Sequence, residues 1–180
     1  AANAQKYYKD YQKAKNAEHI LTEQIEKGRS ELEYIDSVLD TVSRAESERE
    51  LAQIREELTE QGYLRKQKGK QRPQAALPPL EFTSSDGFKI LVGRNNTQND
   101  KLTLKIANKN DMWLHTKDIH GSHTVVFAEG REISDTAILE AAQLAAYYSK
   151  ARESSQVPVD YTLVRYVSKP SGARPGMVIY

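Results

Sequence analysis

The first forty residues carry apolar side chains at alternating steps of four and three. This spacing is the heptad pattern of a helix with one apolar stripe, so it predicts a coiled-coil helix. Glu18 and Gly28 interrupt the stripe. Because a glycine inside a helix costs about 1 kcal/mol relative to alanine, we expect a kink or break at Gly28. The stripe consists of Tyr7, Tyr11, Ala14, Leu21, Ile25, Leu32, Ile35, Leu39 and Val42.

A second, shorter amphipathic helix is expected from Ser47 to Gln61. Ser47 is a good capping residue, and Gly62 is a typical helix stop. This segment is too short to cover the whole stripe. The stripe therefore needs another partner, which is either a helix upstream in a longer chain or a second copy of this chain.

Downstream of residue 80 the pattern changes to short apolar runs that alternate with two helical stretches. We therefore predict an α+β fold: a helical coiled-coil arm at 1–64, a linker at 65–79 and a small mixed α/β domain at 80–180. Asn99 or Asp100 is expected to cap the first helix of this domain, and Ser134 the second. The expected strands are 89–92, 111–115, 122–127, 159–167 and 177–180, and the expected helices are 99–107 and 134–152.

Composition narrows the function classes. Lys and Arg total 26 against 25 Asp and Glu, so there is no overall basic field to attract a nucleic acid. The sequence has no cysteine, which excludes disulfides, cysteine nucleophiles and thiolate metal sites. No apolar run reaches the roughly 20 residues of a membrane span, and no signal peptide is visible. Since the sequence begins without Met and stops inside an apolar run, we expect a piece of a longer protein.

One segment departs from the charge balance. Residues 65–72 carry five cations and no acid. Such a run is most often a solvated linker, and the alternative is a patch that contacts RNA phosphates. Its cations are Arg65, Lys66, Lys68, Lys70 and Arg72.

Three of the four histidines lie between residues 111 and 123. A metal site there would combine histidines with Asp111 or Asp118, but the spacing matches no standard closed site, so we expect no metal. A hydrolase built on Ser122 would lack a nucleophile elbow. In a binding site, Trp113 and the histidines would stack on RNA bases. The alternative is that Trp113 anchors the core.

Two further polar segments are candidates for phosphate contacts. Residues 93–100 lead into a helix start whose amides could hold an anion beside Arg94, although a simple turn and cap would explain the same residues. Residues 168–176 form a Gly/Pro-rich loop with two cations. The candidate RNA-binding residues are Arg94, Asn95, Asn96, Lys105, Trp113, His115, Lys117, His123, Lys169 and Arg174. We expect no catalytic residue and no cofactor.

Together these segments resemble the NFACT-R domain of the NFACT family, which includes proteins of the RqcH, NEMF and FbpA/PavA types. The sequence departs from the family pattern at His120, a position where many family members have a proline. Residues 3–13 resemble the start of the returning helix of the family's coiled-coil arm. The resemblance rests on 85–88, 92–96, 98–100, 111–115, 121–123, 140–142, 145–149, 159–161, 169–170 and 175–176.

The resemblance implies a cytoplasmic ribosome quality-control factor and no enzyme activity in this chain. Such a factor binds large ribosomal subunits that hold a stalled peptidyl-tRNA, recruits charged tRNA and promotes alanine tailing of the nascent chain. The family residues for tRNA handling lie mostly outside the matched segments, so none is assigned here. The alternative is a surface-exposed fibronectin-binding adhesin of a Gram-positive bacterium, exported by an unconventional route. Lacking its partner helix, the N-terminal helix of the arm is expected to associate with a second copy of the chain or to fray.

Overall fold

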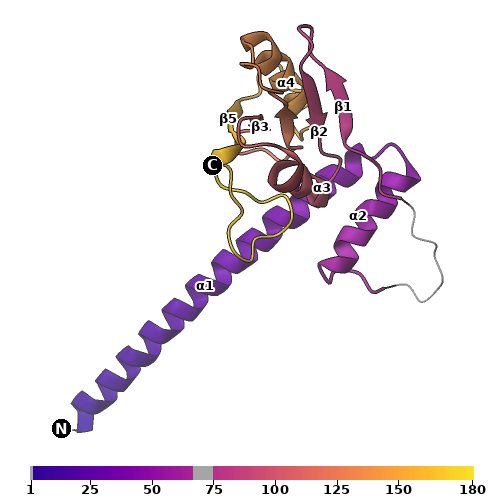
Figure 1. Cartoon of the computed structure of the whole chain (residues 1–180). Coiled ribbons are helices and arrows are strands. Elements are labelled where there is room, and N and C mark those ends of the chain that lie inside the picture. Colours follow the sequence, from indigo (N-terminus) through magenta and orange to yellow (C-terminus); the bar gives the residue numbers. More distant parts are fainter. Residues whose placement is uncertain (1, 67–74) are drawn as a thin grey trace. The chain divides into compact units, whose positions relative to one another are not determined.

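The computed structural model describes residues 2–66 and 75–180 (Figure 1). Its contacts divide the chain into two compact units, Ala1–Ile35 and Asp36–Tyr180. Helix α1 (Ala2–Arg44) is continuous through Gly28, so the predicted break is wrong. One glycine is a small cost in a helix of 43 residues, because propagation adds a hydrogen bond for each further residue. Within the described residues, no helix is long and apolar enough to cross a membrane.

The apolar stripe of α1 remains open to solvent along the first unit. Tyr7 is 74% exposed and Leu32 is 63% exposed, and the side chains between them are similarly accessible. A coiled-coil partner or a second copy of the chain would remove this apolar surface from water. Self-association of the arm therefore stays a prediction.

The second unit starts with the last turns of α1 and with α2 (Glu48–Glu60). Helix α2 begins where Ser47 caps it, since the Ser47 hydroxyl oxygen accepts a hydrogen bond from the Glu50 N–H at 3.3 Å. This confirms the helix predicted for 47–61. Val38 of α1 and Ile54 of α2 are buried, so both helices contribute to the packing of this unit.

Five antiparallel strands form one sheet in the order β1-β2-β4-β3-β5. Together with the helices, the sheet gives the α+β fold that the sequence predicts. The sequence does not predict the first strand, because its run of four residues is too short to show a clear period. The strands are β1 (Leu80–Thr83), β2 (Lys89–Val92), β3 (Met112–Thr116), β4 (Thr124–Val126) and β5 (Val159–Leu163).

Side chains alternate along the strands and so form two cores, one on each face of the sheet. Helix α4 (Asp135–Tyr147) covers the first face with its buried alanines (Figure 1). On the second face, α3 (Asn96–Lys101) continues into the π-helical turn η1 (Leu102–Ile106), where Leu102 packs into the core. The first core contains Phe88, Ile90, Leu114 and Val126, and the second contains Leu91, Trp113, Val125 and Val164.

Several element ends differ from expectation. Helix α3 starts after Asn95, which caps it in place of Asn99 or Asp100. Helix α4 stops at Tyr147, because Ser149 pairs with Gly121 and draws the chain out of the helix. Strand β5 passes into the 3₁₀ turn η2 (Val164–Tyr166), and β4 is shorter than predicted. Residues 177–180 form only a bridge between Ser168 and Ile179.

Candidate nucleic-acid interface

The segment after β2, residues 93–100, consists of a short turn and most of α3, and is called the polar loop below. Its side chains bind other segments of the second unit. The Arg94 guanidinium pairs with the Glu50 carboxylate of α2 and donates to the Pro78 carbonyl oxygen at 2.9 Å. The Asn95 side chain accepts from the Gln98 N–H at 2.8 Å, while Asn96 donates to the Ser37 hydroxyl at 2.8 Å. Asn95 and Asn96 are buried, so they hold the unit together and do not offer a surface to RNA.

The start of α3 does meet an anion, as the sequence predicts, but the anion belongs to this chain. One carboxylate oxygen of Glu57 accepts from the Thr97 N–H at 3.0 Å and from the Thr97 hydroxyl at 3.1 Å. Glu57 is 3% exposed. A carboxylate at a helix N-terminus is stabilised by the helix dipole and by the free amides there. The expected phosphate site is therefore already filled.

The two candidate cations of the C-terminal loop are also engaged. Lys169 pairs with Asp100, whose second carboxylate oxygen accepts from the Gly176 N–H at 3.0 Å. Arg174 donates to the Gln61 side-chain oxygen at 3.0 Å, and its guanidinium lies 5.3 Å from the centre of the Tyr63 ring. Both cations thus fix the loop, and a direct role of either in RNA binding stays a prediction.

Trp113 and His123 lie inside the domain and cannot stack on RNA bases. Trp113 is fully buried and His123 is 1% exposed. The centres of their rings lie 5.2 Å apart in an edge-to-face contact, and the Tyr180 ring lies 4.6 Å from that of Trp113. The interpretation of Trp113 as a core anchor is correct, because a lone tryptophan on a strand with both faces covered buries a large apolar area.

His123 is held as a neutral ring. The Nε2 atom of His123 lies 3.2 Å from the Gly176 carbonyl oxygen, which can only accept, so Nε2 carries the proton and donates. In the neutral ring the Nδ1 atom then accepts from the Thr103 hydroxyl at 2.8 Å. Burial, followed by the neighbouring His115, lowers the pKa of His123 to about 3. Both ring nitrogens are therefore used in holding the C-terminal loop against η1.

His115 stacks on Trp113, with the ring centres 5.7 Å apart, as expected for alternate residues of one strand. Burial lowers the pKa of His115, so the ring is neutral at neutral pH. Among the described residues, no group of three or more His, Asp and Glu side chains is placed to hold a metal ion. His115 is partly exposed, and its contact with RNA stays a prediction.

Next to the polar loop lie four exposed cations, Lys101, Lys105, Lys109 and Arg165, which are together called the cationic face. Lys101 and Lys105 are four residues apart on the continuous α3–η1 segment and so lie on one side of it. The segment then leads to Lys109, whose carbonyl oxygen accepts from the Arg165 N–H at 3.3 Å. Within residues 2–66 and 75–180, none of the four side chains forms a hydrogen bond or an ion pair.

The acids that flank this segment are occupied elsewhere. Asp100 is bound to Lys169 and Gly176, while the two carboxylate oxygens of Asp111 accept from the Asn108 and Ala128 N–H groups. Tyr166 follows Arg165, is 63% exposed, and has the Arg165 guanidinium 5.6 Å from its ring centre. An exposed ring beside exposed cations is an arrangement that suits single-stranded RNA.

Sequence reasoning found one of these four cations, Lys105. The missed signal is the regular spacing of the lysines at 101, 105 and 109 with no acid between them; the first two lie on the α3–η1 segment, and Lys109 follows its end. Lys117 is exposed too, but it follows the other end of β3 and lies apart from this face. In the basic run, Arg65 and Lys66 are exposed, whereas Lys68, Lys70 and Arg72 lie outside the described residues.

Comparison with known families decides the relationship. Residues 79–179 match the NFACT protein RNA binding domain, and residues 1–76 match the NFACT N-terminal and middle domains. This chain belongs to the NFACT family. The two matched ranges meet inside the predicted linker.

Individual NFACT relatives agree over nearly the whole chain. The sequence is 50% identical to the Rqc2 homolog RqcH of Bacillus subtilis and 46% identical to that of Streptococcus suis, with 99% of this chain aligned in each case. It spans 31% and 32% of the lengths of these relatives, or about a third. The solved C-terminal part of the fibronectin/fibrinogen-binding protein from Streptococcus suis superposes with a TM-score of 0.93 at 44% identity, covering 99% of this chain and 71% of that one.

Proposed function

We propose that this chain is the RNA-binding part of a ribosome quality-control factor. The intact protein would bind large ribosomal subunits obstructed by a stalled nascent chain, together with tRNA, and would promote alanine tailing of that chain. This role implies a cytoplasmic protein. The match to the NFACT RNA-binding domain supports the general role, and the similarity to RqcH proteins supports the ribosomal one.

We assign the proposed RNA contacts to the residues of the cationic face. Its four exposed cations can approach successive phosphates, and Tyr166, beside the Arg165 guanidinium, offers a ring on which a base can stack. The chain would contribute binding and no covalent chemistry. In support of this, His123 and Asp111, which could otherwise act as acid or base, are buried and already hydrogen-bonded.

A salt series tests the proposal. The variant with Lys101, Lys105, Lys109 and Arg165 all replaced by Ala is compared with the wild type by fluorescence anisotropy on a short single-stranded RNA and by co-sedimentation with large ribosomal subunits. Each lost phosphate contact should reduce the slope of log affinity against log salt by about 0.7 on single-stranded RNA. The quadruple variant should therefore bind more weakly and with a slope smaller by about 2 to 3.

A matched control removes four exposed lysines from α1, namely Lys9, Lys13, Lys15 and Lys27, so that the net charge changes equally. Equal losses in the two variants would show that binding follows net charge alone and would refute the role of the cationic face. A third variant, in which the basic run 65–72 is neutralised, measures the share of the linker.

A second candidate function is binding of fibronectin. The similarity to the C-terminal part of a streptococcal fibronectin/fibrinogen-binding protein favours it. Immobilised fibronectin should then retain the purified chain in a saturable manner, and the quadruple variant separates the two activities, because only RNA binding is assigned to the cationic face. Retention that disappears at physiological salt would argue against this candidate.

A further inference from the structure

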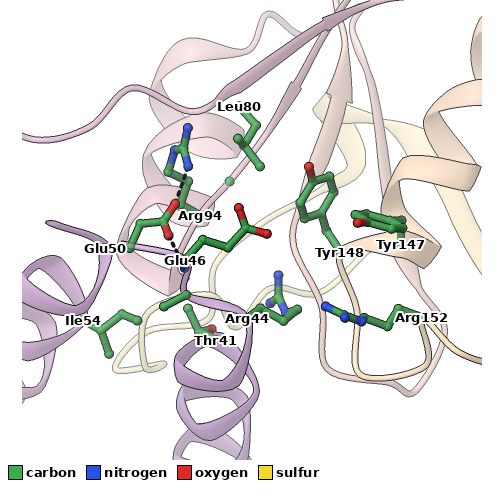
Figure 2. A pocket seen from close by; sticks show the side chains of 12 residues that line it. Thr41, Arg44, Glu46, Glu50, Ile54, Leu80, Arg94, Tyr147, Tyr148 and Arg152 are labelled. Atoms are coloured by element: carbon green, nitrogen blue, oxygen red, sulfur yellow. Dashed lines mark hydrogen bonds and ion pairs between the residues drawn. The ribbon is translucent and has the colours of Figure 1, made fainter. Parts of the chain in front are cut away.

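A pocket of about 70 Å³ opens where several segments of the second unit meet (Figure 2). Its walls come from the end of α1, the start of α2, the beginning of β1, the polar loop and the end of α4. Two tyrosines, three arginines and two glutamates line it. Figure 2 shows these side chains directed around one common space.

The arginines of the pocket are largely neutralised. Arg44 donates to the Asp40 carboxylate at 2.8 Å, and Arg94 is paired with Glu50. Both guanidinium groups are therefore fixed in place, and each arginine–carboxylate pair carries little net charge. Arg152, at the rim, lies 3.1 Å from Glu153. A group with two negative charges would gain little here, whereas a neutral planar ring would meet rigid guanidinium and aromatic surfaces.

Tyr147 and Tyr148 provide the aromatic surface. Their ring centres are 5.0 Å apart in an edge-to-face contact, and Tyr148 is supported from behind by Phe82 at 6.0 Å. Tyr147 is 57% exposed, so a face of its ring is open to an incoming base. Burial, then the neighbouring Tyr147 and Glu46, raise the pKa of Tyr148, which keeps its hydroxyl protonated as a donor.

The Glu46 carboxylate lines the pocket and has no partner among the described residues. Its backbone N–H donates to Glu50 at 2.8 Å, but within the described parts of the chain its side chain has no hydrogen bond or ion pair. In Figure 2 the carboxylate extends into the space between Arg94 and Tyr148. An ionised carboxylate only accepts hydrogen bonds, so it selects a ligand edge with adjacent N–H donors.

Among the four RNA bases, guanine has two adjacent donors, N1–H and N2–H, on its Watson–Crick edge. Adenine and cytosine place a ring acceptor beside their amino group, and the imino group of uracil stands between two carbonyls. We propose that the pocket binds an unpaired guanine base of RNA, stacked on Tyr147 with its N1–H and N2–H donating to Glu46. The O6 atom then faces the arginines, which can only donate. This inference rests on the proposed RNA-binding function.

The test uses short uridine-rich single-stranded RNAs that carry one central guanosine, inosine or adenosine. Inosine lacks the 2-amino group and keeps the rest of the guanine edge. The wild type should bind the guanosine RNA about tenfold more tightly than the adenosine RNA, with inosine between them. Glu46→Gln and Tyr147→Leu should each remove most of this preference, and stacking alone corresponds to a loss of about fivefold or more.

Two matched controls are exposed residues of the same kind outside the pocket. Glu48→Gln and Tyr161→Leu should leave the preference unchanged. Glu46 and Tyr147 are exposed, so their variants are expected to fold, and the circular dichroism of each is compared with that of the wild type. RNA binding without a preference for guanosine, or a preference that survives Glu46→Gln, overturns the pocket assignment alone. Failure of the wild type to bind any of the RNAs overturns the proposed function as well.

Discussion

The polar loop and the cationic face are neighbours in the sequence, and both are rich in polar residues. In the polar loop, side chains meet partners from other segments of the same unit, as Arg94 meets Glu50 and Thr97 meets the buried Glu57. In the cationic face, the lysine side chains have no partner within the described parts of the chain. A charge that is already paired has little left to offer a ligand, whereas an unpaired one retains its full attraction for phosphate. Whether a polar side chain is already bound to another group of the chain thus distinguishes a structural segment from a binding surface better than its residue type does.

The most severe way to break the polar loop is Gly93→Ala. A Cβ at this position would overlap the Asn99 Oδ1 atom and would lie 3.2 Å from the Asn99 Cα atom. Asn99 would have to move, and the Oδ1 atom that accepts from the His123 N–H at 3.1 Å would be lost from its place. We expect the free energy of unfolding to fall by about 3 to 5 kcal/mol, measured by urea denaturation.

Gly28→Ala is the control for a change from glycine to alanine. No heavy atom lies within 4 Å of the position that the new Cβ would take, and the site is inside α1. Helix propensity favours alanine there by about 1 kcal/mol. Equal destabilisation by the two substitutions would contradict the crowding assigned to Gly93.

Glu57→Ala removes the carboxylate at the start of α3. The N–H and hydroxyl of Thr97 would lose their acceptor, and the buried Glu57 side chain would leave a gap, so the free energy of unfolding should fall by about 1 to 3 kcal/mol. Glu56→Ala, one residue earlier and exposed, should change it by less than about 0.5 kcal/mol. Similar values for the two variants in urea denaturation would show that the Thr97 contacts contribute little.

Acid should weaken the contact between His123 and the C-terminal loop. Its pKa is about 3 in the folded chain against 6.5 ordinarily, so between these values the unfolded chain binds the extra proton. The contribution is complete above about pH 6.5 and falls by about 1.4 kcal/mol per pH unit below it. The difference in unfolding free energy between wild type and His123→Asn should therefore shrink from pH 7 to about pH 5. A constant difference would mean that the pKa of the ring is the same in the folded and the unfolded chain.

The smallest expected effect is on the salt dependence of RNA binding, and it distinguishes Lys105 from Lys117, which are both candidate RNA-binding residues from the sequence. Lys105→Ala should lower the salt slope of RNA binding by about 0.7, whereas Lys117→Ala, beyond the far end of β3, should leave it unchanged. Anisotropy titrations at several salt concentrations measure both slopes. If Lys117→Ala changes the salt slope more than Lys105→Ala does, the RNA-binding surface lies at the opposite end of β3.

Local patterns predicted much of the fold. The α+β class, strand β2, helix α2 and the Ser134 cap of α4 follow from period and capping chemistry, which act over a few residues. The relation to NFACT proteins was predicted from the family resemblance and not from these local patterns.

The polar loop could not be assigned in the same way. Nothing near Thr97 indicates that its partner is Glu57, 40 residues earlier, or that Asn96 meets Ser37, 59 residues earlier. The burial of Trp113 likewise depends on α3–η1 covering the second face of the sheet. The four-residue lysine spacing was readable, but its importance depends on Asp100 and Asp111 being occupied elsewhere.

The long-range contacts of the polar loop also have a kinetic consequence. Asp100 reaches Gly176 over 76 residues, and Asn96 reaches Ser37 over 59. Contacts between such distant segments close large loops and form late, after local helices and hairpins have already appeared. Substitutions in this loop should therefore act mainly by speeding unfolding, with little effect on the rate of folding. The contacts of the polar loop are therefore expected to set the unfolding rate, and so the lifetime, of the folded second unit.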